Sequence, residues 1–381
     1  MIQGPVSRRS FASALGAGLG AVLLEPRART HGAEASVARG EPAAAIQLNS
    51  NENPYGPSPR ALDALTRAQG LAGRYPDAEE DAVRDAIARL HGVVPERVVL
   101  GCGSTEVLRM AAHAFLGTGR TVLAAEPTFE AVLHFARVTQ AESVKVPLTA
   151  DFRHNLAAMA KAVDGRTGLV YVCNPNNPTG TIVPSEELDA FLTSLPSSVV
   201  VLVDEAYHHF VESPRYRSAC EWLERTPNLV VARTFSKIYG MAGMRLGYAV
   251  GSEGNVAAMQ RHSFWSNANV AVLQAALASL QDADLVPRQR ALINETRRWL
   301  CAQLTKQGRR VIPSETNFVM IDVGGDVAPI IAAFRERRIL VGRRFASLPH
   351  WLRVSIGTRA EMEAFLAALG QVVPTVAGAA A

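Results

Sequence analysis

Short apolar runs alternate with helical segments through the middle of this chain of 381 residues. The runs contain no charged residue and cover residues 98–100, 121–125, 168–173, 199–203 and 229–232. Strands of this kind are buried on both faces, which is typical of a parallel sheet with helices on each side. The sequence therefore predicts an α/β fold with a mostly parallel central sheet, followed by a smaller α/β unit over 317–373.

A lysine lies in the loop that follows the last of these runs. Lys237 comes between two strand-like runs, with Thr234 and Ser236 before it and Arg245 after it. A loop lysine whose pKa is lowered by burial and nearby cations can form a Schiff base. Hydroxyl groups and an arginine can bind a phosphate beside it. The pattern suits pyridoxal phosphate, although a solvated surface lysine is the commoner case.

Two further strand ends carry polar side chains that suit the same cofactor. Asp204 ends an apolar strand, and a buried carboxylate needs a partner such as a protonated pyridine nitrogen. Tyr207 follows closely enough to bond the phenolic oxygen of the ring, and Asn177 lies in a turn after the preceding strand. The alternatives are a helix cap or metal ligand for Asp204 and a simple turn residue for Asn177.

Three other stretches are candidates for binding. Residues 101–106 join a strand to a helix, but Glu106 takes the place of the third glycine of a dinucleotide motif, so a phosphate site is favoured. Residues 48–59, here named the polar segment, are dense in turn formers and cannot be a helix or central strand. Arg353, within the strand-like run 351–356, could clamp a carboxylate or face solvent.

Together these segments resemble the fold-type I, class I/II, PLP-dependent aminotransferases, and within them the histidinol-phosphate aminotransferases. The resemblance covers nearly all of the chain after Ile46. It rests on residues 51–57, 74–76, 103–106, 174–180, 204–207, 236–237 with Arg245, 316–318 and 352–353. It implies a large domain with a mostly parallel sheet plus a smaller α/β domain.

The resemblance also implies roles for individual residues. Lys237 would hold the cofactor as a Schiff base and act as the catalytic residue. The implied cofactor-binding residues are Ser104, Thr105, Phe129, Asn177, Asp204, Tyr207, Thr234, Ser236, Lys237, Arg245 and Tyr75. Tyr75 would reach the phosphate bound by the other subunit of a homodimer. The implied substrate-binding residues are Tyr55, Asn177 and Arg353.

The implied reaction moves an amino group from an amino acid or amino alcohol phosphate to a 2-oxo acid, with 2-oxoglutarate as the expected acceptor. Lys237 would move a proton between the substrate carbon and the cofactor carbon as a general acid–base. In the family an arginine commonly follows the strand matching 339–341, where this chain has Gly342, Arg343 and Arg344. An aminotransferase for aromatic or other amino acids, a PLP decarboxylase or lyase, and an exported binding protein without turnover are the alternatives.

The N-terminus resembles a twin-arginine export signal. Arg8 and Arg9 precede an uncharged run that is too short to span a membrane, and residues 33–35 suit a cleavage site. The predicted location is therefore the periplasm, or the cytoplasm if the signal does not function. The predicted divisions are a signal peptide over 1–35, an N-terminal arm over 36–75, a large PLP-binding domain over 76–284, a small domain over 285–373 and a tail over 374–381.

Composition excludes some classes of partner. The net charge of +4 is small and the basic residues are scattered, so no nucleic-acid-binding surface is expected. The four cysteines lack metal-ligand spacing, and no metal is expected. They can be buried thiols or disulfides.

Overall fold

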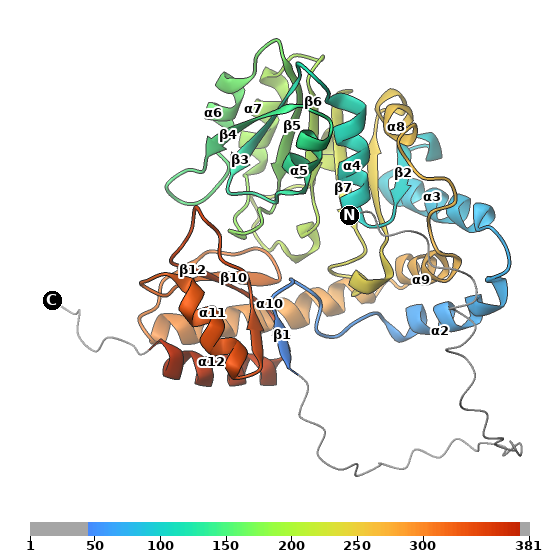
Figure 1. The fold of residues 1–381 in the computed structure, drawn as a ribbon. Helices are drawn as coiled ribbons and strands as arrows, with labels where there is room; N and C mark the ends of the chain where they lie inside the picture. Colours follow the sequence, from blue (N-terminus) through green and yellow to red (C-terminus); the bar gives the residue numbers. More distant parts are fainter. Residues whose placement is uncertain (1–44, 374–381) are drawn as a thin grey trace, which may run out of the picture. The chain divides into compact units, whose positions relative to one another are not determined.

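The computed structural model describes residues 45–373 (Figure 1). The predicted signal peptide 1–35, residues 36–44 of the predicted arm and the predicted tail 374–381 lie outside the described residues.

A seven-stranded sheet forms the centre of the large lobe, with the order β2-β8-β7-β6-β5-β3-β4. Its strands are β2 (Val98–Gly101), β3 (Thr121–Glu126), β4 (Glu142–Pro147), β5 (Thr167–Cys173), β6 (Val200–Asp204), β7 (Leu229–Thr234) and β8 (Gly247–Gly251). Only β8 runs antiparallel to its neighbours in this sheet. The predicted mostly parallel sheet is confirmed.

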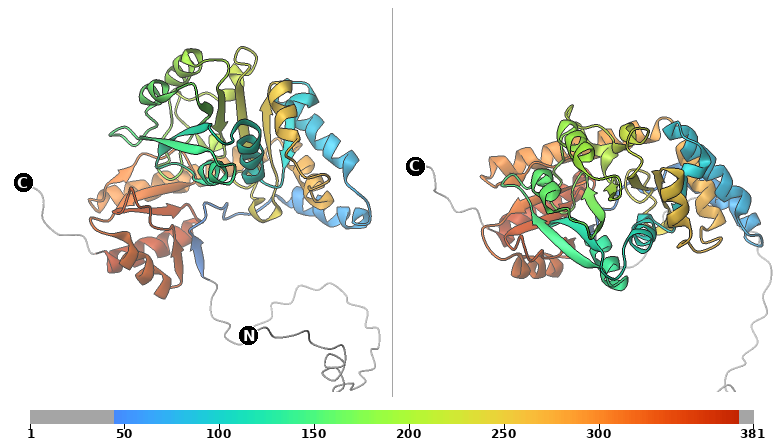
Figure 2. Two further views of the ribbon diagram at one scale, coloured as in Figure 1. Left: turned by 45° about the horizontal axis from the view of Figure 1, so that its top comes forward. Right: turned by 90° about the horizontal axis from the view of Figure 1, so that it is seen from above.

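Helices cover both faces of this sheet. Successive strand residues point to opposite sides, and here the residues on both sides are apolar, so both faces must be covered. Val200 and Leu202 of β6 pack in one apolar cluster, and Val201 and Val203 pack in another. The first cluster includes residues of α4 (Ser104–Phe115), α5 (Ala131–Val138) and α8 (Glu253–Gln260). The second includes residues of α3 (Asp77–His91), α6 (Leu156–Ala162), α7 (Ser185–Ser194) and α9 (Val270–Leu280). The sheet is thus buried on both sides, and Figure 2 shows the ribbon from two further directions.

The small lobe combines the start of the described chain with its end. β1 (Ile46–Leu48) pairs in parallel with β11 (Ile339–Val341). β10 (Phe318–Asp322) lies between β12 (Trp351–Ser355) and β9 (Val311–Ile312), antiparallel to both. The remaining helices are α10 (Leu285–Lys306), which leads into this lobe, α11 (Val327–Glu336) and α12 (Arg359–Val372). The predicted domain boundaries stay predictions, because the described residues belong to one compact unit.

Helix ends follow the local signals in the sequence. α2 (Pro59–Arg67) begins after Ser58, whose hydroxyl accepts from the Ala61 N–H at 3.2 Å. α3 ends at Gly92, which has the left-handed conformation that favours glycine. None of the helices within residues 45–373 has the length and apolar character needed to cross a bilayer.

Candidate active site

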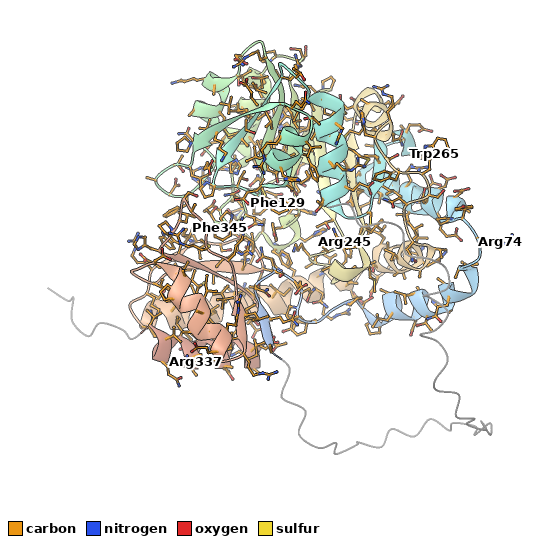
Figure 3. All side chains as sticks on the ribbon, in the orientation of Figure 1. Arg74, Phe129, Arg245, Trp265, Arg337 and Phe345 are labelled. Carbon is orange, nitrogen blue, oxygen red and sulfur yellow. The ribbon has the colours of Figure 1, made fainter. Side chains whose placement is uncertain are left out.

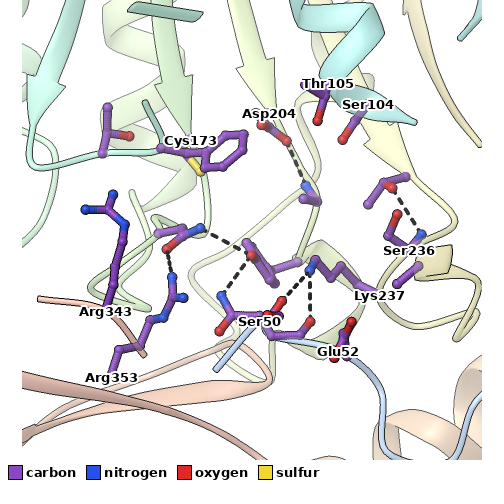
Figure 4. Close-up of a pocket in the computed structure, with 18 of the residues that line it drawn as sticks. Ser50, Glu52, Ser104, Thr105, Cys173, Asp204, Ser236, Lys237, Arg343 and Arg353 are labelled. Carbon is purple, nitrogen blue, oxygen red and sulfur yellow. Dashed lines mark hydrogen bonds between the residues drawn. The ribbon is translucent and has the colours of Figure 1, made fainter. Parts of the chain in front are cut away.

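A cavity of about 370 Å³ lies at the carboxyl ends of the central strands, where an open α/β sheet binds ligands (Figure 4). Every predicted cofactor residue except Tyr75 lines it, and so does Arg353. These residues are Ser104, Thr105, Phe129, Asn177, Asp204, Tyr207, Thr234, Ser236, Lys237, Arg245 and Arg353. Segments far apart in the sequence therefore meet at one place.

Lys237 lies in the predicted loop between β7 and β8, and its amine reaches the polar segment. Nζ donates to the carbonyl oxygens of Asn51 at 2.8 Å and Ser50 at 3.3 Å. Burial, followed by the positive charge of Arg353, lowers the pKa of Lys237 to about 8. A minor fraction of the amine is therefore neutral near physiological pH and can act as a nucleophile, and the neutral form becomes the larger one above about pH 8.

Asp204 is 2% exposed at the end of β6. The Tyr171 hydroxyl donates to Oδ2 at 2.9 Å, and the Ala206 N–H donates to Oδ1 at 3.1 Å. Burial raises the pKa of Asp204 to about 6. Both donors are neutral, so this carboxylate lines the cavity without an ion-pair partner among the described residues. A protonated pyridine nitrogen would supply the missing charge.

Another group of residues that line the cavity suits a phosphate group. α4 begins at Ser104, so the unpaired N–H groups of its first turn lie beside the hydroxyls of Ser104 and Thr105. Arg245 lies beside them and donates to the Ser236 hydroxyl at 3.3 Å. The start of α4 also packs closely against Gly247 of β8, because a Cβ atom on Gly247 would lie 2.3 Å from the Ser104 nitrogen. A helix N-terminus, hydroxyls and an arginine together bind a dianion well.

A chain of side chains connects the centre of the cavity to the small lobe. Asn177 donates from Nδ2 to the Tyr207 hydroxyl at 3.4 Å and accepts at Oδ1 from Nη1 of Arg353 at 2.8 Å. Nη2 of Arg353 donates to the Asn49 carbonyl at 2.9 Å, but the buried Nε has no partner. Nη1 and Nη2 each carry a second hydrogen, so the guanidinium, which lines the cavity, can also donate to a substrate carboxylate or phosphate.

The polar segment contributes residues that sequence reasoning missed. Ser50, Asn51 and Glu52 line the cavity, whereas the predicted Tyr55 does not and is 37% exposed. Asn51 has a left-handed φ of 54°, which turns the chain so that its backbone carbonyl meets Lys237. The sequence signalled an ordered turn here but not which side chains face inward. A substrate role for Tyr55 stays a prediction.

Tyr75 lies outside the cavity of a single chain. Its side chain is 83% exposed, and the neighbouring Arg74 lies at the outer edge of the molecule, away from Phe129 and Arg245 (Figure 3). Within one chain Tyr75 therefore has no contact with the cofactor residues.

The family pattern of the class I and II aminotransferases matches residues 43–369. The chain belongs to this family. It is 39% identical to a histidinol-phosphate aminotransferase of Moorella thermoacetica over 86% of this chain and 85% of the relative. It is 37% identical to an aromatic amino acid aminotransferase of Cutibacterium acnes over 86% of this chain and 93% of the relative. The crystal structure of a histidinol-phosphate aminotransferase from Sinorhizobium meliloti in complex with pyridoxal-5'-phosphate has a TM-score of 0.82 and 30% identity, and covers 88% of this chain and 92% of that chain.

The residues present fit pyridoxal phosphate, and the protein is a PLP-dependent aminotransferase with an amino donor and a 2-oxo acid as substrates. When bound, the cofactor supplies an electron sink for the negative charge that develops on the substrate carbon. Lys237 would take the proton from that substrate carbon and deliver it to the cofactor carbon. Asp204 would stabilise positive charge on the pyridine nitrogen, and Arg353 would orient the acidic group of the substrate.

Proposed function

We propose that this aminotransferase takes the amino group of histidinol phosphate and passes it to 2-oxoglutarate. Several of its relatives carry the name histidinol-phosphate aminotransferase, including one at 39% identity. The observation that carries the proposal is a pair of arginines in the cavity. Arg343 and Arg353 both lie against the ring of Phe345, with guanidinium carbons 4.4 Å and 5.3 Å from its centroid. Two cations match the charge of a phosphate ester better than one.

Arg343 stands one residue beyond the position at which the family resemblance predicts an arginine. Gly342 takes that position, and its backbone packs so closely that a Cβ atom would lie 2.7 Å from the Arg353 carbonyl oxygen. Arg343 instead lines the cavity and pairs with Glu130 at 2.7 Å. Arg344 pairs with Asp326 at 2.7 Å and does not line the cavity. The two neighbouring arginines therefore make a matched test pair.

The test follows the visible spectrum of the loaded enzyme during titration with single amino donors. Histidinol phosphate should convert the cofactor to its amine form, and 2-oxoglutarate should reverse the change. Arg343→Ala should lower kcat/KM for histidinol phosphate by about tenfold, since the exposed arginine contributes one charge-assisted contact. Arg344→Ala should leave it unchanged. A spectrum that does not respond to histidinol phosphate at any concentration refutes this substrate.

An aromatic amino acid is the second candidate donor. The Cutibacterium acnes relative is named for that activity, and Phe129 and Phe345 line the cavity. Such a donor has one carboxylate, so Arg353 alone would bind it. Conversion of the cofactor by an aromatic amino acid, insensitive to Arg343→Ala, would favour this function.

We also propose that the enzyme is a homodimer in which Tyr75 of each subunit completes the phosphate site of the other. Tyr75 is 83% exposed, and Trp265, in the loop beside it, is 95% exposed. The Ser266 hydroxyl donates to Asp77 at 3.3 Å, which holds that loop near Tyr75. Exposed aromatic side chains on two linked loops are typical of an interaction surface.

Coexpression of an impaired variant and an inactive variant tests the shared site. A dimer of one Tyr75→Phe chain and one Lys237→Ala chain has one complete site, so a random mixture should regain about a quarter of wild-type activity. Sedimentation should show two chains. No recovery of activity in confirmed mixed dimers would contradict the role of Tyr75.

Export by the twin-arginine route is the last part of the proposal. Arg8 and Arg9 before an uncharged run support it. Replacing both with lysine should move the protein from the periplasmic to the cytoplasmic fraction. An unchanged distribution would contradict an export signal there.

A further inference from the structure

Asn51 is fixed by bonds to both lobes. Its N–H donates to the Ser355 hydroxyl of β12 at 2.8 Å, and that hydroxyl donates to Asn51 Oδ1 at 3.2 Å. Its carbonyl accepts from Nζ of Lys237 at 2.8 Å. The residue is 2% exposed and has a left-handed φ, which asparagine adopts more readily than most residues. The position of its amide nitrogen is therefore well defined.

That amide nitrogen forms a hydrogen bond with the side chain of Tyr207. Nδ2 of Asn51 donates to the Tyr207 hydroxyl oxygen at 3.1 Å, and Nδ2 of Asn177 donates to the same oxygen at 3.4 Å (Figure 4). Burial raises the pKa of Tyr207, so the phenol stays protonated. Two amides occupy its acceptor positions, and no described group of residues 45–373 accepts its hydrogen. The hydroxyl is left with only a donor role, in a cavity that it lines.

We propose that Asn51 is a positioning residue which, with Asn177, holds Tyr207 as an obligatory hydrogen-bond donor to the ring oxygen of bound pyridoxal phosphate. Asn51 acts through Tyr207 and contacts no reacting atom. A donor at the ring oxygen stabilises its anionic form, so the proton shared between that oxygen and the lysine nitrogen is lost more easily. Asn51 thereby lowers the pH midpoint of the absorbance change of the bound cofactor.

The decisive variant is Asn51→Gly. Glycine keeps the left-handed backbone and the carbonyl that accepts from Lys237, and it removes the side-chain amide, including the Oδ1 that accepts from Ser355. Without that amide the Tyr207 hydroxyl can rotate away from the cofactor. The midpoint of the loaded enzyme should rise by about half to one pH unit, the equivalent of one weakened hydrogen bond. The measurement needs the bound cofactor but no substrate, so it is independent of which donor the enzyme uses.

A double-mutant cycle separates this role from a structural one. Tyr207→Phe should raise the midpoint further, and Asn51→Gly in that background should add no shift. Ser355→Ala, which loosens Asn51 without touching Tyr207, should give a smaller rise and carries the test if Asn51→Gly does not fold. Asn228→Ala removes a buried amide that bonds the Val199 carbonyl at 2.6 Å, away from the cavity, and should lower Tm without moving the midpoint. An unchanged midpoint in both Asn51→Gly and Ser355→Ala, or equal shifts with and without Tyr207, overturns the proposal.

Discussion

Replacing Asp204 with asparagine should stabilise the cofactor-free protein while weakening cofactor binding. Burial raises the pKa of this carboxyl from 3.8 to about 6, which costs about 3 kcal/mol of folding free energy at pH 8. Asparagine carries no charge and avoids that cost. It has one acceptor oxygen for the two donors of Tyr171 and Ala206, so it loses about 1 kcal/mol of hydrogen bonding. The net gain is about 2 kcal/mol at pH 8.

The sign of the pH dependence makes this prediction specific. The carboxylate penalty is fully present above the folded pKa of about 6 and fades as the pH falls toward the unfolded value of 3.8. At pH 5 the advantage of Asp204→Asn should therefore shrink below about 1 kcal/mol. Thermal unfolding of the cofactor-free proteins at both pH values, at one protein concentration, measures it.

The loaded enzyme should behave in the opposite way, because the wild-type carboxylate then pairs with the pyridine nitrogen. Asp204→Asn should raise the cofactor dissociation constant and lower turnover. The control is Asp63→Asn, the same change at an exposed residue of α2, which should alter stability by less than about 0.5 kcal/mol. A cofactor-free Asp204→Asn protein that is less stable than wild type at pH 8 would refute the argument.

Three further predictions concern the cofactor site. Lys237→Ala should abolish transamination and leave a folded protein, as measured by activity and circular dichroism; wild-type turnover would contradict the catalytic role. Gly247→Ala should raise the cofactor dissociation constant by about tenfold, because its Cβ meets backbone at 2.3 Å and such overpacking costs about 1–3 kcal/mol; Gly251→Ala on the same strand, whose Cβ meets a Val230 methyl at 3.3 Å, should have a smaller effect. The rate of cofactor attachment to the apoprotein should rise with pH and level off above about 8, since the Lys237 amine must lose its proton first; a rate independent of pH between 6 and 8 would contradict its lowered pKa.

The buried parts of the large lobe were predictable from the sequence because their pattern is local. The apolar strands and the polar residues at their ends have a periodicity that a parallel sheet explains. The edge strand β4 was missed, since four of its six residues are exposed and polar residues interrupt the apolar pattern. β1 and β9 have three and two residues, and only pairing with distant strands makes them strands.

The residues of the site also divide into those that a local sequence pattern predicts and those that depend on distant contacts. Lys237, Asp204 and Asn177 follow strands, so the fold determines where they lie. Asn51 could not be identified from the sequence, because its role depends on contacts with Tyr207 and Ser355, which are distant in the chain. Tyr75 differs again, since residues 45–373 of one chain offer it no partner in the cavity.

The polar segment has a consequence for how such an enzyme can be recombined. It joins the small lobe through β1 and through Asn317, which donates to the carbonyls of Asn51 and Glu52 at 3.0 Å and 3.2 Å. It joins the lysine loop through Asn53, which donates to the Ile238 carbonyl at 3.1 Å. The two lobes are therefore not interchangeable cassettes. A chimera of two homologues should work only when the polar segment, the lysine loop and the C-terminal strands come from the same parent, although they lie far apart along the gene.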